Sequence, residues 1–207
     1  MEIKLLELAG FRAAMTALRL PHKGTGDSIF EGQIQSGQYA NAQHGNLDVA
    51  ASDNGLEMQA REILPAIRTE LTVAIGPKDM NLASRLVQAS DCEAKVMRGI
   101  IAWTEIKAPI DWWCELETYR AGHERLCSES TMNDEGKGLK GTELREALNK
   151  ISFGREIKKV DYFSYQCLRN IWIWRHKHRK DEWRQFCHWI ETLPFAEEFI
   201  LYGLKRD

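Results

Sequence analysis

Residues 111–132 carry side chains that could perform acid–base chemistry. Glu115 and Tyr119 are four residues apart, so on a helix they would share one face. A carboxylate and a phenol placed together can move protons or read the polar edge of a base. Trp112 and Trp113 lie beside that face and could stack on a base or a flavin ring. The alternatives are solvated surface charges, and tryptophans that belong to the core or to a subunit interface.

Two parts of the chain could bind an anion. Arg120 follows Tyr119 in the segment 111–132, and Ser128 and Ser130 lie later in the same segment, in a polar stretch whose hydroxyls and amides could hold phosphate. Arg175 begins the run Arg-His-Lys-His-Arg-Lys at 175–180, and a guanidinium matches the geometry of phosphate. The same run is expected at a helix C-terminus, where cations complement the helix dipole, so a structural role is an alternative.

The overall charge argues against several function classes. Lys and Arg number 28 and Asp and Glu 30, so the formal net charge is -2 and no global field attracts nucleic acid. Nucleic-acid binding by residues 175–180 is therefore a weaker alternative.

No apolar run approaches the ~20 residues of a membrane span, and the first ten residues do not resemble a signal peptide. Five cysteines without a CxxC pair favour the reducing cytoplasm and predict no metal site.

The length of 207 residues fits one domain, 1–207, and the periodicity of apolar residues predicts that helices predominate in it. Residues 22–55 are rich in Gly, Ser, Asn and Gln and predict a long irregular loop. Residues 123–141 predict a second polar loop. Strands are expected at 2–8 and 99–107. The predicted helices cover 11–18, 56–71 with a break at Pro65, a segment capped by Asp79, 109 to about 122, Thr142 to Asn149, a segment from Asp161 or Ser164 to Trp174, and a segment from Asp181 to Pro194.

Residues 79–200 resemble a group of phage-encoded proteins. The stretches that carry this resemblance are IKAPIDWWCELETYRAG, SESTM and LRNIWIWRHKHRKDEWRQFCHWIETLP. The resemblance implies a phage or prophage source and hence the cytoplasm of a host cell.

The same stretches are similar to flavin-dependent thymidylate synthases. That family has a strand, a helix with Gln-x-x-Arg-His-Arg, a loop with serine and, further on, Leu-Arg, an arginine and Glu-x-Arg. Glu115 falls on the glutamine, and Thr118, Tyr119 and Arg120 fall on Arg-His-Arg, so one of the two arginines is kept. In the family these residues hold flavin and substrate phosphate. The other corresponding positions are Ser128 or Ser130, Leu168-Arg169, Arg175 and Glu182-Trp183-Arg184.

This similarity implies an α+β fold like that of the thymidylate synthase complementing protein, mostly helical, with helices packed around a small mixed sheet. It implies a homo-oligomer, a tetramer or a dimer, with sites between subunits. The implied function is a transferase that binds a uridylate-like pyrimidine deoxynucleotide, with FAD, and modifies the base at carbon 5. The alternative is a non-catalytic phage accessory or anti-defence protein that binds a nucleotide or a host protein. The site residues would be Glu115 and Tyr119 for catalysis, Arg120, Ser128, Ser130 and Arg175 for phosphate, and Trp112 and Trp113 for stacking.

Overall fold

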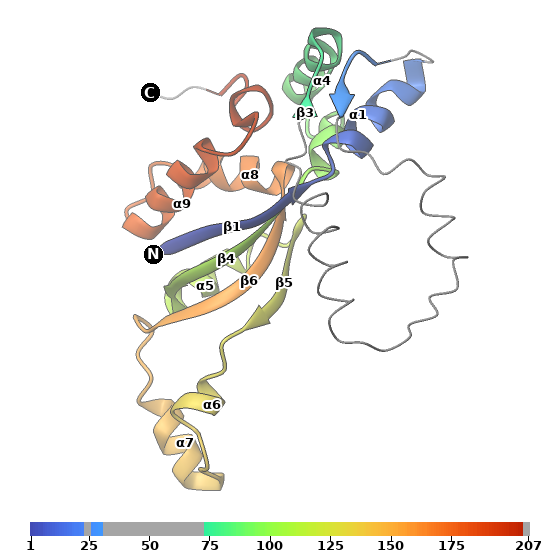
Figure 1. The fold of residues 1–207 in the computed structure, drawn as a ribbon. Coiled ribbons are helices and arrows are strands. Elements are labelled where there is room, and N and C mark those ends of the chain that lie inside the picture. The colour runs from blue at the N-terminus through green and yellow to red at the C-terminus, as the bar shows by residue number, and fades with distance from the viewer. Residues whose placement is uncertain (23–25, 31–72, 205–207) are drawn as a thin grey trace, which may run out of the picture.

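A computed structural model describes residues 1–22, 26–30 and 73–204 of the 207-residue chain (Figure 1). Most of the loop predicted at 22–55, and all of the helical segment predicted at 56–71, lie outside the described residues.

The centre of the fold is a four-stranded sheet in the order β1-β4-β6-β5. Its strands are β1 (Glu2–Ala9), β4 (Ile101–Pro109), β6 (Glu156–Ser164) and β5 (His123–Ser128). Each pair of neighbours is antiparallel. The predicted α+β class is confirmed, whereas the prediction of a mixed sheet is wrong. The strand β6 is antiparallel to β5 on one side and to the whole length of β4 on the other, so neighbouring strands alternate in direction.

Helices cover one face of this sheet and form the core with it. They are α5 (Ile110–Leu116), α8 (Tyr165–Arg175) and α9 (Asp181–Glu191) (Figure 1). Alternate residues of β4 are fully buried: Ala102, Thr104, Ile106 and Ala108. Burial of this apolar surface is the main stabilising contribution.

Three other helices gather at one end of the sheet (Figure 1). They are α1 (Phe11–Arg19), α4 (Pro77–Ala89) and η2 (Ala94–Arg98). The remaining short elements here are η1 (Leu20–His22), η3 (Ala196–Ile200) and the pair β2 (Ile29–Phe30) and β3 (Val73–Ala74).

At the other end, the connection from β5 to β6 projects away from the sheet (Figure 1). It holds α6 (Thr131–Asp134) and α7 (Gly141–Asn149), and neither helix has a buried residue. We call residues 129–155 the arm.

The helix predicted to start at Asp79 is present, but Asp79 does not cap it. The N-cap is Gly76, with Pro77 at the first position. The carboxylate of Asp27, from a distant part of the chain, accepts the free N–H groups of Lys78 and Asp79 at 2.9 and 3.0 Å. The caps predicted at Thr142 and Asp181 are likewise shifted, to Lys140 and Lys180.

Two strands of the four-stranded sheet were not predicted from the sequence. β5 occupies part of the stretch read as a polar loop, and β6 contains Asp161, which was a candidate helix start. The other candidate, Ser164, is the N-cap of α8, and its Oγ accepts from the N–H of Cys167 at 3.2 Å. The helix predicted from 109 to about 122 ends at Leu116.

A candidate nucleotide cleft beside α8

A tight turn after α5 brings Arg120 to the start of α8. The N–H of Tyr119 donates to the carbonyl of Leu116 at 2.9 Å, which closes the turn. Gly122 then adopts a φ of 80°, and its carbonyl accepts from the N–H of Ser164 at 2.7 Å. A Cβ on Gly122 would lie 2.2 Å from Ser164 Oγ, so this close approach requires glycine. We call residues 117–122 the Arg120 turn.

Two adjoining hollows lie between the Arg120 turn and α8, and together we call them the α8 cleft. The first has a volume of about 360 Å³ and is lined by Asp91, Thr118, Tyr119, Arg120, Ala121, Cys167, Asn170 and Trp174. The second, of about 630 Å³, is lined by Asp91, Arg98, Ile101, Ala121, Gly122, Tyr162, Ser164, Gln166 and Asn170. They share Asp91, Ala121 and Asn170, so they form one continuous concave surface.

The two arginines of the cleft differ in their contacts. Arg98 is fixed, because its Nε donates to Gln166 Oε1 at 2.6 Å and its Nη2 donates to the carbonyl of Asp91 at 3.1 Å. Arg120 is exposed, and within the described part of the chain its guanidinium has neither a hydrogen bond nor an ion pair. Arg120 therefore presents a full set of donors to the cleft.

Trp174 lies on the same hollow as Arg120 and is 75% exposed. All seven tryptophans belong to the described residues, and Trp174 is the one whose side chain is largely exposed. Its sequence spacing indicated a place in the apolar stripe of α8. It lies instead near the helix end, where its indole can stack on a flat ligand.

Trp112 and Trp113 occupy the core and do not offer a stacking surface. Their side chains are 0% and 1% exposed. Trp112 packs on Trp183 with ring centroids 4.9 Å apart, and Trp113 Nε1 donates to the carbonyl of Ala108 at 3.1 Å. The structure supports the core interpretation for both, and the stacking role predicted for them is incompatible with their burial.

The structure does bring Glu115, Tyr119 and Arg175 together, but in contact with one another. Arg175 Nη1 donates to Glu115 Oε2 at 3.2 Å, and Arg175 Nε donates to the hydroxyl of Tyr119 at 2.9 Å. Glu115 also accepts from Trp183 Nε1 at 2.8 Å and from Lys180 Nζ at 2.6 Å. We call these five residues the Glu115 cluster.

Within this cluster the guanidinium of Arg175 already has three partners in the same chain. Its guanidinium lies 4.6 Å from the ring centroid of Trp183, in addition to its contacts with Glu115 and Tyr119. It does not line the α8 cleft. Within this chain these contacts engage Arg175 with its own neighbours, and the phosphate binding expected from the sequence stays a prediction.

The charges in the Glu115 cluster stabilise one another. Burial alone would raise the pKa of Glu115, but hydrogen bonds from Lys180 and Trp183 outweigh it and hold that pKa below its usual value. Burial would lower the pKa of Lys180, but its hydrogen bonds to Asp111 and Glu115 raise it. Glu115 is thus a carboxylate at neutral pH and a poor proton donor, contrary to the acid role considered from the sequence.

The two serines predicted to bind phosphate lie away from Arg120. Ser128 pairs with Lys159 at the far end of β5, five residues or roughly 16 Å from His123, the first residue after the Arg120 turn. Its hydroxyl donates to the carbonyl of Glu129 at 2.9 Å. Ser130 lies at the N-terminus of α6, on the arm. Within one chain they do not form a site with Arg120.

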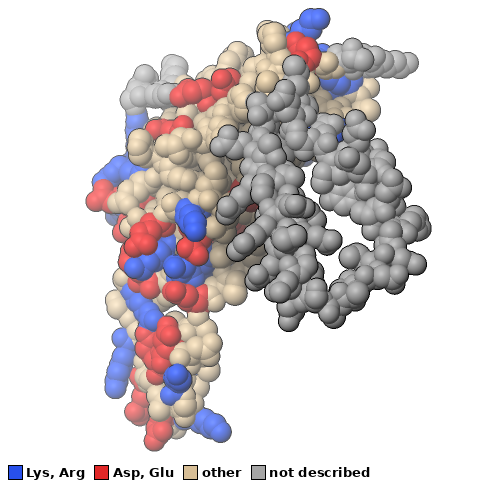
Figure 2. All heavy atoms as spheres, viewed as in Figure 1, with Lys and Arg blue, Asp and Glu red and all other residues tan. Residues whose placement is uncertain are grey.

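Several side chains of the basic run at 175–180 contact other residues of this chain around the connection between α8 and α9. His176 stacks on Trp172 with ring centroids 4.2 Å apart. Lys180 pairs with Asp111 at 2.7 Å as well as with Glu115. On the face seen in Figure 2, Lys and Arg are interspersed with Asp and Glu. These contacts weaken the nucleic-acid alternative, which needs a continuous positive surface.

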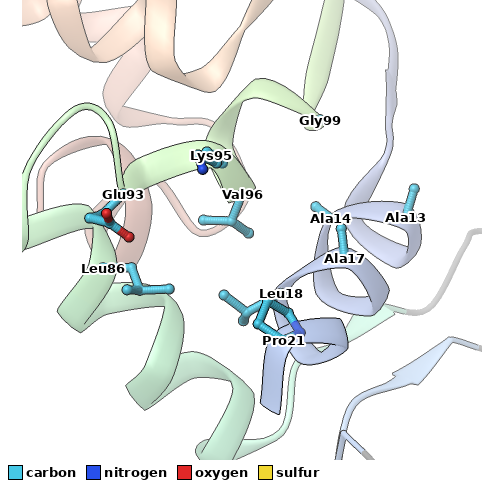
Figure 3. A pocket seen from close by; sticks show the side chains of 10 residues that line it. All are labelled: Ala13, Ala14, Ala17, Leu18, Pro21, Leu86, Glu93, Lys95, Val96 and Gly99. Atoms are coloured by element: carbon cyan, nitrogen blue, oxygen red, sulfur yellow. The ribbon is translucent and has the colours of Figure 1, made fainter. Parts of the chain in front are cut away.

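A separate apolar hollow of about 630 Å³ lies between α1, α4 and η2. Figure 3 shows Leu18, Leu86 and Val96 pointing into it from three elements. Two lining side chains are charged, Glu93 and Lys95. With a single cation on its wall, against the two arginines of the α8 cleft, this hollow is less suited to a nucleotide.

Within residues 1–22, 26–30 and 73–204, no group of three or more His, Cys, Asp or Glu side chains is placed to hold a metal ion. No helix in those ranges is both long and apolar enough to span a bilayer.

Comparison with solved structures identifies the fold. The chain is similar to two crystal structures of the flavin dependent thymidylate synthase ThyX from Helicobacter pylori, each with FAD and dUMP. The first superposes with a TM-score of 0.58 at 13% sequence identity, covering 99% of this chain and 100% of that chain. The second gives 0.57 at 13% identity, with 98% of each chain covered. No protein-family model and no curated protein matches the sequence. The chain has the fold of ThyX.

Proposed function

We propose that this protein binds a pyrimidine deoxynucleoside monophosphate, uridylate-like, in the α8 cleft. The observation that carries the proposal is that Arg120, whose guanidinium has no partner among the described residues, and an exposed indole, Trp174, line the same hollow. The ThyX structures of the same fold contain dUMP, which supports this class of ligand.

Each group in the cleft has a role that its chemistry suits. Arg120 would bind the phosphate through its forked N–H donors. Trp174 would stack on the base, an interaction worth about 1–3 kcal/mol in proteins that bind single-stranded nucleic acids. The side-chain amide of Asn170, which belongs to both hollows, offers donors and an acceptor to the edge of a pyrimidine.

FAD belongs to the proposal through the fold likeness. A flavin dinucleotide has a diphosphate as well as two ring systems, whereas the described part of the cleft has one unpaired guanidinium. Arg98 is already held by Gln166 and Asp91. The described residues of one chain thus fit a mononucleotide and do not fit the diphosphate of FAD. In a homo-oligomer with its sites between subunits, as the sequence resemblance implies, the second chain would have to supply the other cation.

Two functions follow from a nucleotide site on this fold. One is a transferase that modifies the base at carbon 5. The other is a phage accessory protein, acting in the cytoplasm of the host, that binds a nucleotide or a host protein without turnover. The contacts of Glu115 and Tyr119 with Arg175 favour the second, because they leave no free acid or base among the residues predicted to be catalytic.

The test is a titration of the purified protein with dUMP, deoxyuridine and dTMP, followed by calorimetry. We expect dUMP to bind and deoxyuridine to bind at least tenfold more weakly, because it lacks the phosphate. Arg120→Ala should weaken dUMP to the level of deoxyuridine, and Trp174→Ala should weaken both. Arg179→Ala, at an exposed arginine outside the cleft, is the matched control and should bind as the wild type does.

Equal affinity for nucleotide and nucleoside, unchanged by Arg120→Ala, would refute the proposed site. The absorbance spectrum and native mass of the same preparation address the flavin and the oligomer. Flavin bands that disappear in Arg120→Ala would favour the transferase, whereas a colourless protein that binds dUMP without converting it would favour the accessory protein.

A further inference from the structure

Another hollow lies at the end of the sheet where α1 and α4 pack together (Figure 1). It has a volume of about 500 Å³ and is lined by Arg19, Pro77, Lys78, Asn81, Leu82 and Arg85. Three of these six side chains are cationic and none is acidic. The hollow shares no lining residue with the α8 cleft, and we call it the α4 hollow.

One face of α4 forms most of its wall. The four residues Lys78, Asn81, Leu82 and Arg85 stand at positions i, i+3, i+4 and i+7 of the helix, so they share one side. Lys78 and Arg85 are exposed, and within the described part of the chain neither side chain has a hydrogen bond or an ion pair. Seven residues of helix rise by about 10 Å. This face therefore presents two cations, two turns apart, with no anion to neutralise them.

The third cation, Arg19, is held in a fixed position. It is the last residue of α1, and its Nε donates to Oδ1 of Asp79 in the first turn of α4. Asp79 is 1% exposed, and its Oδ2 accepts from the N–H of Ser28 at 3.0 Å. The buried carboxylate thus anchors Arg19 beside the start of α4. A guanidinium that is already held loses little freedom when it binds an anion.

The guanidinium of Arg19 has a donor to spare. Its Nη2 is buried and has no hydrogen-bond partner among the described residues. A buried donor without an acceptor is unfavourable, and in folded proteins such a group commonly contacts a water or an ion. An oxygen of an anion in the α4 hollow would supply the missing acceptor.

Two carboxylates lie beside the α4 hollow without lining it, and both already have donors. Asp79 is engaged by Arg19 and Ser28. Asp27 accepts from the N–H groups of Lys78 and Asp79 at 2.9 and 3.0 Å. These contacts also occupy donors at the N-terminus of α4. A ligand in the hollow would therefore be held by side chains and not by the free N–H groups of the helix.

We propose that the α4 hollow binds a chain of adjacent phosphates, as found in nucleoside triphosphates and inorganic polyphosphate, through Arg19, Lys78 and Arg85. Arg19 matches phosphate oxygens with its forked donors, and the other two supply charge on either side. Cations spread over two turns of a helix suit a row of phosphates better than a single one. The site is separate from the nucleotide site of the α8 cleft and does not depend on it.

The test is titration calorimetry of the full-length protein with tripolyphosphate and with orthophosphate, at low salt and without divalent cations. We expect tripolyphosphate to bind and orthophosphate to bind at least tenfold more weakly. Lys78→Gln and Arg85→Gln should each weaken tripolyphosphate at least fivefold, and the double variant should reduce it to the level of orthophosphate. Lys137→Gln and Arg145→Gln, at exposed cations on the arm, are the matched controls and should bind as the wild type does.

The source of the phosphates is decided by two further ligands, measured in Arg120→Ala so that the α8 cleft contributes little. Binding of dTTP more tightly than tripolyphosphate would identify a nucleotide as the ligand, whereas weaker binding would identify inorganic polyphosphate, and both support the site. A short oligothymidylate that binds more tightly than either, and loses this affinity in Lys78→Gln and Arg85→Gln, would assign the hollow to a nucleic-acid backbone and overturn the inference.

Three other results would also overturn it. They are wild-type affinity in the double variant, equal affinity for tripolyphosphate and orthophosphate, and loss of tripolyphosphate binding in Arg120→Ala, which would place the anion in the α8 cleft. Failure of dUMP to bind would refute the proposed function and leave the α4 hollow untouched. Arg19 is not replaced, because its loss would leave the buried carboxylate of Asp79 without its cation and would destabilise the fold.

Discussion

Replacement of Glu115 by alanine separates a structural role from a catalytic one. The change removes the acceptor of the Trp183 indole N–H, which is fully buried, and the anion that neutralises Arg175 and Lys180. An unsatisfied buried N–H costs about 1–3 kcal/mol. Each of the two part-exposed ion pairs contributes about 0.2–1 kcal/mol. We therefore expect Glu115→Ala to lower the free energy of unfolding by about 2–4 kcal/mol.

The assay is urea unfolding at pH 7, followed by tryptophan fluorescence and circular dichroism together. With a slope of about 2 kcal/mol per molar urea, the midpoint should move by about 1–2 M. Glu115→Gln keeps one oxygen for Trp183 and should lose less than Glu115→Ala. Glu124→Ala, at an exposed glutamate on β5, is the control and should stay within about 0.5 kcal/mol of the wild type.

The pH dependence has a defined sign. The pKa of Glu115 is lower in the folded protein than in the unfolded chain, so its contribution is complete above the unfolded value and is lost as the pH falls through the folded one. The difference between wild type and Glu115→Gln should therefore shrink in acid. Affinity for dUMP should be unchanged in both Glu115 variants. A variant with wild-type stability but tenfold weaker binding would show that Glu115 contacts the ligand, and our reasoning would be wrong.

Three further predictions concern stability and are measured by the same urea experiment. Trp183→Ala should lose about 3–5 kcal/mol, because the indole is fully buried; a loss below 1 kcal/mol would contradict its core position. Asp79→Ala should lose about 3–5 kcal/mol, since it leaves part-buried Arg19 without its partner. Burial would raise the pKa of Asp79, but hydrogen bonds from Ser28 and the contact with Arg19 outweigh it and lower that pKa. Its share of stability should therefore be complete above the unfolded value and be lost as the pH falls through the lowered folded value, and an acid-independent share would refute this. Gly122→Ala should lose at least about 1–3 kcal/mol because of its positive φ and the contact with Ser164, and wild-type stability would exclude that geometry.

The helices were predictable because their apolar residues recur at helical spacing. The sheet was only half predictable. β6 buries Ile157, Lys159, Asp161 and Phe163 on one face, so two of its four inward side chains are charged. A period-two hydrophobic pattern is absent from such a strand. The partners of its buried Asp161 are His123 and Arg125 of β5, which no local signal identifies.

The candidate site was predictable in part for a similar reason. The segment 111–132, which contains Arg120, was found from its residue types. The engagement of Glu115 with Trp183 joins residues 68 positions apart, and no local pattern indicates it. Trp174 shares the i, i+3 spacing of the buried Ile171, but it lies at the last turn of α8, beyond the elements that cover the rest of the helix.

The arm gives this protein a natural place for engineering. The two strands that carry it are paired at its base, because the N–H of Glu129 donates to the carbonyl of Lys158 at 2.8 Å where β5 meets β6. The two helices between them contribute no side chain to the core. A short turn could therefore replace most of the arm, or a reporter domain could be spliced into it, with both new junctions far along the sheet from Arg120. The same connection would serve as an anchoring point for immobilising the protein on a sensor surface with its cleft facing outward.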